Sequence, residues 1–81
     1  MNTERDKLDE MLRSAHARDD AVALTELYTR AADQSEDNGD IDAACFYLTH
    51  AFVFGLQCGS DATRDLQRRL WRYGREIRPE G

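Results

Sequence analysis

The sequence predicts a small all-α domain of four antiparallel helices, and three observations carry this prediction. The 81-residue chain has one proline and 33% charged residues, with long runs of Ala, Leu, Arg, Glu and Asp that favour helix. Apolar residues recur at helical spacing in four segments. Glycine breaks separate these segments at Gly39 and Gly59. So short a chain forms one domain, residues 1–81. We expect helices near residues 3–17, 20–38, 40–57 and 61–77, and a short tail over 78–81.

The first two expected helices are amphipathic. The first has apolar residues at the i, i+3, i+4, i+7 spacing of one helical face, namely Leu8, Met11, Leu12 and Ala15. Asp20 offers an N-cap for the second helix, whose apolar stripe consists of Leu24, Leu27, Tyr28, Ala31 and Ala32. Gly39 suits the position after a helix end, and Asp40 can cap the next helix at once. The second and third helices are therefore expected to form a tight antiparallel hairpin.

The third helix is expected to be the buried centre of the domain, because it is apolar nearly all round. Its main stripe is Ile41, Ala44, Cys45, Leu48, Ala51, Phe52, Gly55 and Leu56. Its other flanks add Phe46, Tyr47, Val53 and Phe54. Polar residues such as Asp42 and Gln57 interrupt the run, so a core helix is favoured over a membrane span. If the neighbouring helices leave the aromatic flank open, it forms a groove for a partner helix or a homodimer face. Complete coverage by those helices is the alternative.

The fourth helix is expected to begin at Ser60 or Asp61 and to be basic. Its apolar stripe is Leu66, Leu70, Tyr73 and Ile77, with Gly74 placed to permit close approach of a neighbouring element. Another face carries a basic ridge of Arg64, Arg68, Arg72 and Arg75. Arginine beside Trp71 can hold phosphates or contribute to a protein interface. In the alternative interpretation, Trp71 and Tyr73 pack inward and the arginines pair with the acidic first two helices.

The hairpin between the second and third helices resembles a tetratricopeptide-type (TPR-like) repeat. The similar residues cover about one repeat, roughly residues 24–56: Leu27, Tyr28, Ala31, Ala32, the Gly39-Asp40-Ile41 turn, Ala44, Leu48 and Ala51. The chain lacks the Trp-Leu-Gly opening of the first helix and the proline after the second, and it is too short for three stacked repeats. The resemblance implies a protein-interaction scaffold whose groove holds a peptide or a helix.

Charge and cysteine content limit the classes of function. The net charge of −5 argues against a simple nucleic-acid or anionic-membrane binder. Residues 1–60 have net charge −7 and residues 61–81 have net charge +2, so an acidic body can complement an Arg-rich last helix within the chain. The polar amino terminus shows no signal segment. The two cysteines match no redox or metal spacing. The polar amino terminus and these cysteines together predict a cytoplasmic protein of bacterial type.

The sequence carries no recognisable metal, cofactor or catalytic motif. His16, His50, Cys45 and Cys58 match no ligand spacing, and Cys45 and His50 fall on different faces of one helix. There is no Gly-rich phosphate loop and no nucleophile elbow. We therefore expect no metal, no cofactor and no enzymatic activity, with His50 as the one titratable group inside the apolar helix.

The leading hypothesis is a non-enzymatic protein-binding module or small regulatory adaptor. A partner helix or peptide would dock on the aromatic flank of the third helix, and the fourth helix would orient it by charge; a homodimer is also open. The candidate partner-binding residues are Phe46, Tyr47, His50, Phe54, Arg68, Trp71, Arg72 and Arg75. The alternative is a nucleic-acid-related regulator, which binds phosphates through the arginines or imitates them with an acidic surface. The acidic residues in question are Asp19, Asp20, Glu36, Asp37, Asp40 and Asp42.

Overall fold

The protein is all-helical over the part of the chain that the structure describes. The computed structural model describes the backbone of residues 3–75 and the side chains of residues 6–75. Its helices are α1 (Thr3–Ala17), α2 (Ala21–Asp37), α3 (Ile41–Cys58) and α4 (Thr63–Arg72). The predicted fold class is confirmed. Three of the helices agree with the expected boundaries to within about one residue, and α4 does not.

Aspartate side chains begin the two helices of the central hairpin, as the sequence predicts. Asp20 Oδ1 accepts a hydrogen bond from the Ala23 amide, and Asp40 Oδ1 accepts one from the Ala43 amide, each at 3.1 Å. These bonds satisfy N–H groups that have no partner inside the helix. The start of α4 differs, since Ser60 Oγ binds the Ala62 amide outside the helix at 3.1 Å and no side chain caps the helix itself. As a result α4 begins later than expected, at Thr63.

All four helices end in the same backbone motif. In each, an amide just beyond the helix binds the carbonyl five residues earlier, as Asp40 N does to Ser35 O at 2.9 Å. The motif requires one residue with positive φ. That residue is Gly39 after α2, Gly59 after α3 and Gly74 after α4, whereas Asp19, with φ of 56°, fills the position after α1.

The fourth helix is shorter than predicted because of Gly74. The sequence suggested that this glycine lies inside a helix over 61–77 and permits close approach. Instead it has φ of 76°, a Cβ there would meet nothing within 4 Å, and the Arg75 amide turns back to the Leu70 carbonyl at 2.8 Å. The helix therefore ends at Arg72. Ile77 and the predicted tail lie outside the described residues.

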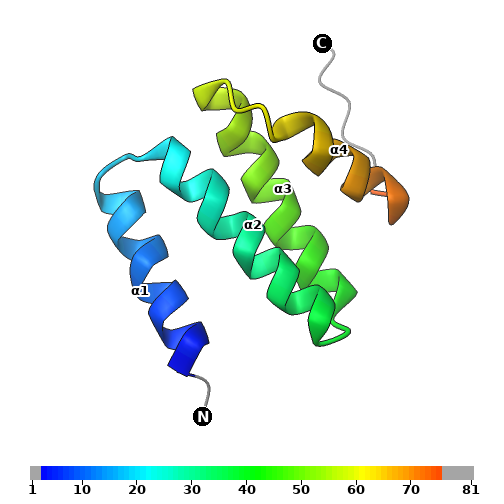
Figure 1. Ribbon diagram of the computed structural model, residues 1–81, viewed down its shortest axis with the longest axis horizontal. Helices are drawn as coiled ribbons and strands as arrows, with labels where there is room; N and C mark the ends of the chain where they lie inside the picture. Colours follow the sequence, from blue (N-terminus) through cyan, green and yellow to red (C-terminus); the bar gives the residue numbers. More distant parts are fainter. Residues whose placement is uncertain (1–2, 76–81) are drawn as a thin grey trace.

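The helices follow one another in chain order across a flat molecule (Figure 1). Its Cα extents are 39, 31 and 17 Å. Helix α2 packs on α1 and α3, and α4 packs on α3. The pair α2 and α3 forms the most extensive contact, which is the predicted hairpin.

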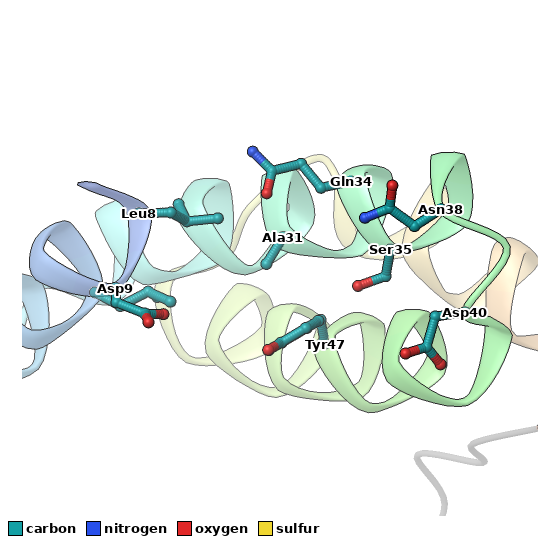
Figure 2. Close-up of a pocket in the computed structure, with 9 residues that line it drawn as sticks. Leu8, Asp9, Ala31, Gln34, Ser35, Asn38, Asp40 and Tyr47 are labelled. Carbon is teal, nitrogen blue, oxygen red and sulfur yellow. The ribbon is translucent and has the colours of Figure 1, made fainter. Parts of the chain in front are cut away.

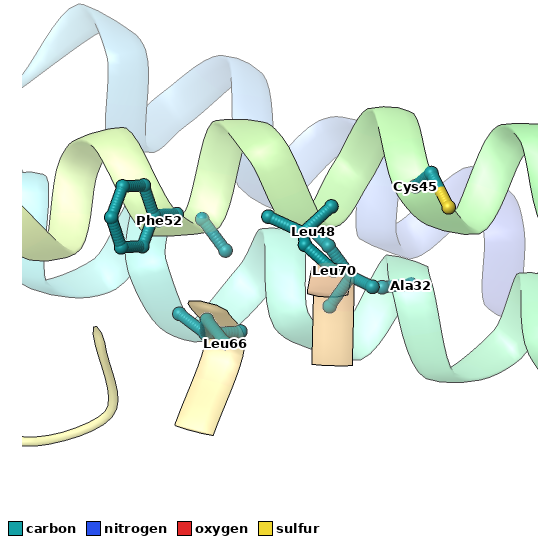
Figure 3. Close-up of a cluster of buried hydrophobic side chains, with 7 residues drawn as sticks. Ala32, Cys45, Leu48, Phe52, Leu66 and Leu70 are labelled. Atoms are coloured by element: carbon teal, nitrogen blue, oxygen red, sulfur yellow. The ribbon is translucent and has the colours of Figure 1, made fainter. Parts of the chain in front are cut away.

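Two buried clusters hold the helices together. The first joins α2, α3 and α4, with Leu48, Leu66 and Leu70 fully buried at its centre (Figure 3). The second joins α1 to α2 through Leu8, Ala15, Leu24, Leu27 and Ala31. Large apolar side chains that leave water in this way supply most of the driving force for folding.

The third helix is central but buried along only one side. It contributes Ala44, Cys45, Leu48, Ala51, Phe52 and Gly55 to the interior. Ile41 and Leu56, which the sequence assigned to the main apolar stripe, are 37% and 52% exposed. By length and composition alone α3 could cross a membrane, yet a third of it is packed inside the domain. The neighbouring helices cover its α2 and α4 sides and leave an outer apolar face open.

Candidate protein-binding surface

The four candidate residues on α3 take part in one aromatic cluster, defined here as His16, Tyr28, Phe46, Tyr47, His50 and Phe54. Tyr28 of α2 lies at its centre, with its ring nearly parallel to that of Phe54 at a centroid distance of 5.9 Å. It also contacts the His50 ring at 5.0 Å and the Tyr47 ring at 6.2 Å. Phe46, Tyr47, His50 and Phe54 are thus linked through ring contacts on α3 and with Tyr28.

Hydrogen bonds fix both histidines of the aromatic cluster. His50 Nδ1 donates to the Phe46 carbonyl at 2.9 Å. His16 Nε2 and Tyr28 Oη share a hydrogen bond at 2.9 Å, which ties the end of α1 to α2. Burial raises the pKa of Tyr28, and the neighbouring Tyr47 raises it further. Sequence spacing gave no signal for His16, because its partners lie on other helices.

Most of the aromatic cluster supports the fold, and Phe46 is its exposed member. Tyr47 and Phe54 are half-buried and pack against the buried clusters, whereas Phe46 is 57% exposed. Along the same outer side of α3 lie Val53 and Leu56, which are 44% and 52% exposed. We call Phe46, Val53 and Leu56 the α3 stripe. Their spacing of seven and three residues places them on one helical face, a signal that the sequence already contained.

The arginines of α4 fall into two groups. Arg69 binds Asp33 and Glu36 of α2 at 2.7 and 2.9 Å, and Arg75 binds Asp42 of α3 at 2.8 Å. The other three are exposed, and none of the carboxylates that the structure describes lies within ion-pair distance of them. We call this second group, Arg64, Arg68 and Arg72, the arginine ridge. Arg75 was expected on the ridge, but its side chain ties α4 to α3.

Glu36 is the carboxylate that holds α4 against α2. Its two oxygens accept hydrogen bonds from the Tyr73 hydroxyl and from Arg69. The hydrogen bond from Tyr73 is the main cause that lowers the pKa of Glu36. The charge of Arg69 lowers this pKa further, whereas burial acts in the opposite direction. The same hydrogen bond raises the pKa of Tyr73. Tyr73 does pack inward: its ring lies partly buried against the first cluster, and its hydroxyl binds Glu36.

Trp71 lies on the flank of α4 that faces α3. Successive residues turn by about 100° around a helix axis, so Arg69 and Trp71 flank the buried Leu70 on opposite sides. Arg69 reaches α2, which leaves Trp71 on the α3 side. Trp71 is 68% exposed, so the interpretation that it packs inward is wrong.

The Arg75–Asp42 ion pair connects the apolar parts of the two helices. Arg75 follows the end of α4, and Asp42 lies one turn before Phe46 on α3.

Around the α4 axis the 100° turn places Arg64 and Arg68 next to Trp71, and Arg72 toward Arg69. The α3 stripe is thus exposed on one helix, and Trp71 and the arginine ridge on the helix that packs beside it. We call these residues together the α3/α4 face.

The carboxylates considered for phosphate mimicry are mostly engaged within the fold. Asp20 and Asp40 cap helices, Glu36 binds Tyr73 and Arg69, and Asp42 binds Arg75. Asp19 and Asp37 are exposed. Four of the six side chains therefore have a structural role.

A polar hollow lies between α1 and the α2–α3 hairpin, with a volume of about 240 Å³ (Figure 2). Leu8 and Asp9 line it from α1, and Tyr47 lines it from α3. Near the other end of α1, the His16 ring contacts the Phe54 ring edge to face, with centroids 5.7 Å apart. Over residues 6–75, no three His, Cys, Asp or Glu side chains converge as metal ligands.

No family model matches the sequence, and no curated protein or solved structure matches it significantly. The interpretation of the surface therefore rests on its own residues.

Proposed function

We propose that this protein is a non-enzymatic binding module, a small regulatory adaptor that docks a helix or peptide of another protein on its α3/α4 face. The observation that carries the proposal is the α3 stripe, a row of large apolar side chains that the fold leaves in water beside an exposed tryptophan. Exposed apolar side chains gathered on one surface are typical of interaction sites. Tryptophan and arginine are also enriched among residues that dominate binding energy.

The shape of the α3/α4 face supports a helical or extended partner. Phe46, Val53 and Leu56 follow the helix axis over about 15 Å, since each residue advances by about 1.5 Å. A helix-in-groove partner would place apolar residues at i, i+3 or i+4 and i+7 along this line. Tyr47 and His50 contact the Phe46 ring, and Phe54 stacks on Tyr28 within the same cluster, so we assign these three a supporting role in binding.

The TPR-like hairpin and the free thiols fit the same proposal. The hairpin residues that carry the resemblance, such as Ala31, Leu48 and Ala51, are buried between α2 and α3. Cys45 and Cys58 are free. We propose a cytoplasmic site of action, because a reducing compartment preserves such thiols.

Affinity enrichment with paired variants tests the proposal. Val53→Asp places a charge on the α3 stripe, and Met11→Asp places one on α1, at a side chain of matched exposure: 44% against 45%. We expect a defined set of proteins to be retained by the wild type and by Met11→Asp and lost with Val53→Asp. Circular dichroism should show that both variants remain helical.

Two results would contradict the proposal. One is a set of retained proteins that Val53→Asp does not change. The other is tight binding of a duplex oligonucleotide that weakens steeply with salt and is insensitive to Val53→Asp, which would favour the nucleic-acid alternative.

A further inference from the structure

We infer that the partner segment is an acidic amphipathic helix, whose apolar face covers the α3 stripe and Trp71 and whose carboxylates, on one flank, bind the arginine ridge. This inference rests on the proposed function and specifies the chemistry of the partner at the same site.

The positive charge that selects this partner belongs to arginines that form no ion pair within the described part of the fold. Arg69 on α4 and Arg75 just beyond its end are neutralised by carboxylates of α2 and α3. None of the ridge residues forms an ion pair with a described carboxylate, although the chain has an excess of acidic residues. The charge of Arg72 acts on Glu36 and lowers its pKa, whereas Arg64 and Arg68 keep a local positive charge on an acidic molecule.

The spacing of the ridge matches that of a helix lying alongside it. Arg64, Arg68 and Arg72 follow at intervals of four residues, which corresponds to about 6 Å each. Glutamates at i, i+4 and i+8 of a partner helix recur at the same distance. Guanidinium groups bind carboxylates through two parallel N–H···O bonds, so each ridge position can orient one partner side chain.

The surface is asymmetric across the α3 stripe. The arginine ridge lies on its α4 side, and on the other side α3 presents His50 and Gln57. A partner helix is therefore expected to carry its acid on one flank of its apolar face.

A protein helix fits this surface better than a nucleic acid does. The α3 stripe needs apolar partner atoms, which a phosphate backbone does not provide. Asp61 and Asp65 are exposed next to the ridge, and residues 1–60 carry net charge −7, so a long polyanion meets repulsion around three arginines.

The test is selection from a displayed library of 20-residue helical peptides. Their apolar face is fixed as leucine at i, i+3, i+4 and i+7, and every other position varies among Glu, Lys, Gln and Ser. The targets are the wild type, the ridge variant and a charge-matched control. The ridge variant is Arg64→Gln, Arg68→Gln and Arg72→Gln. The control is Lys7→Gln, Arg13→Gln and Arg30→Gln, three exposed basic residues of α1 and α2.

We expect glutamate at four-residue spacing on one flank after selection on the wild type and on the control. The best peptide should bind the ridge variant about tenfold more weakly, since three exposed ion pairs are lost. Titration calorimetry should show affinity that falls between about 50 mM and 500 mM salt for the wild type and changes less for the ridge variant.

If the selected peptides show no enrichment in glutamate and still lose binding to Val53→Asp, this inference is overturned and the proposed function stands. If the wild type enriches no peptide, or if Val53→Asp binds the selected peptides equally well, both fail. Tighter binding of a 20-base-pair duplex than of the best peptide would replace the acidic helix with a nucleic acid.

Discussion

At the scale of single residues, Asp19 occupies a backbone position that the chain elsewhere gives to glycine. Its φ of 56° closes the end of α1, where Gly39, Gly59 and Gly74 close the other helices. A residue with a Cβ adopts this left-handed conformation at a cost of about 1 kcal/mol, and aspartate tolerates it better than most.

Asp19→Gly is expected to raise the free energy of unfolding by about 0.5 to 1 kcal/mol, because it relieves the left-handed strain. Urea denaturation followed by circular dichroism measures the change. Gly39→Ala, the control in the opposite direction, should lower stability by about 1 kcal/mol. A loss of stability in Asp19→Gly would mean that the aspartate side chain contributes more than its backbone costs.

Protonation of Glu36 at low pH is expected to lower the free energy of unfolding. Its pKa is lowered by the Tyr73 hydrogen bond and by Arg69, so the ionised form is favoured in the folded state. A lowered folded pKa adds stability above the unfolded pKa, and this stability disappears as the pH falls through the folded value.

Glu36→Gln should therefore be less stable than the wild type at pH 7 and should lose less stability on acidification below the ordinary glutamate range of about 4.3. Thermal unfolding across this pH range gives the comparison. Glu26→Gln, at an exposed glutamate of the same helix, should follow the wild-type profile. Parallel profiles for wild type and Glu36→Gln would remove Glu36 from the acid response.

At the scale of elements, Gly55 sets how closely α3 meets its neighbours. A Cβ at this position would lie 2.6 Å from Thr63 Cγ2 at the start of α4 and 3.5 Å from Thr25 Cγ2 of α2. Thr63 cannot easily turn away, since its hydroxyl donates to the Ser60 carbonyl at 3.0 Å.

Gly55→Ala is consequently expected to destabilise the protein by about 1 to 2 kcal/mol, although alanine normally favours a helix interior by about 1 kcal/mol. Thr63→Ser removes the obstructing methyl group and should restore most of the loss in the double variant. A double-mutant cycle by urea denaturation measures this coupling. Additive effects would show that the contact does not limit the packing.

The first helix is the least anchored element, because it packs mainly on α2 and reaches α3 only through side chains at its inner face, such as His16 against Phe54. We expect faster amide hydrogen exchange in the middle of α1 than in α2 or α3. His16→Ala should speed the exchange of α1 further, since it removes the Tyr28 hydrogen bond and the Phe54 contact. Equal protection in α1 and α2 would show that the Leu8 cluster anchors α1 without this contact.

At the scale of the whole molecule, the free α3 stripe predicts a particular solution state. If the stripe is reserved for a partner protein, the purified chain should be a monomer. Light scattering after size exclusion, at low and high salt, measures this. A stable dimer at both salt concentrations that Val53→Asp dissociates would show that a second copy occupies the stripe.

The candidate site divides into parts that the sequence could and could not predict. The gathering of Phe46, Tyr47, His50 and Phe54 follows from their spacing on one helix. The separation of Arg75 from the ridge does not, because it depends on Asp42, 33 residues away along the chain. Trp71 was equally undecided, since helical spacing orients a residue only when the position of the neighbouring helix is known.

The sequence by itself determined the four helices, the hairpin at Gly39 and the capping aspartates. These depend on local interactions, between residues within about four positions of one another, and the residue types suffice to predict them. The early end of α4 at Gly74 is also local, although the sequence pattern suggested that this glycine permits close approach. The tertiary structure alone decided that α3 is covered on one side only and which arginines remain without ion-pair partners. Those properties depend on which helices lie beside one another, and burial and ion pairing between distant segments are not encoded in the spacing of any one helix.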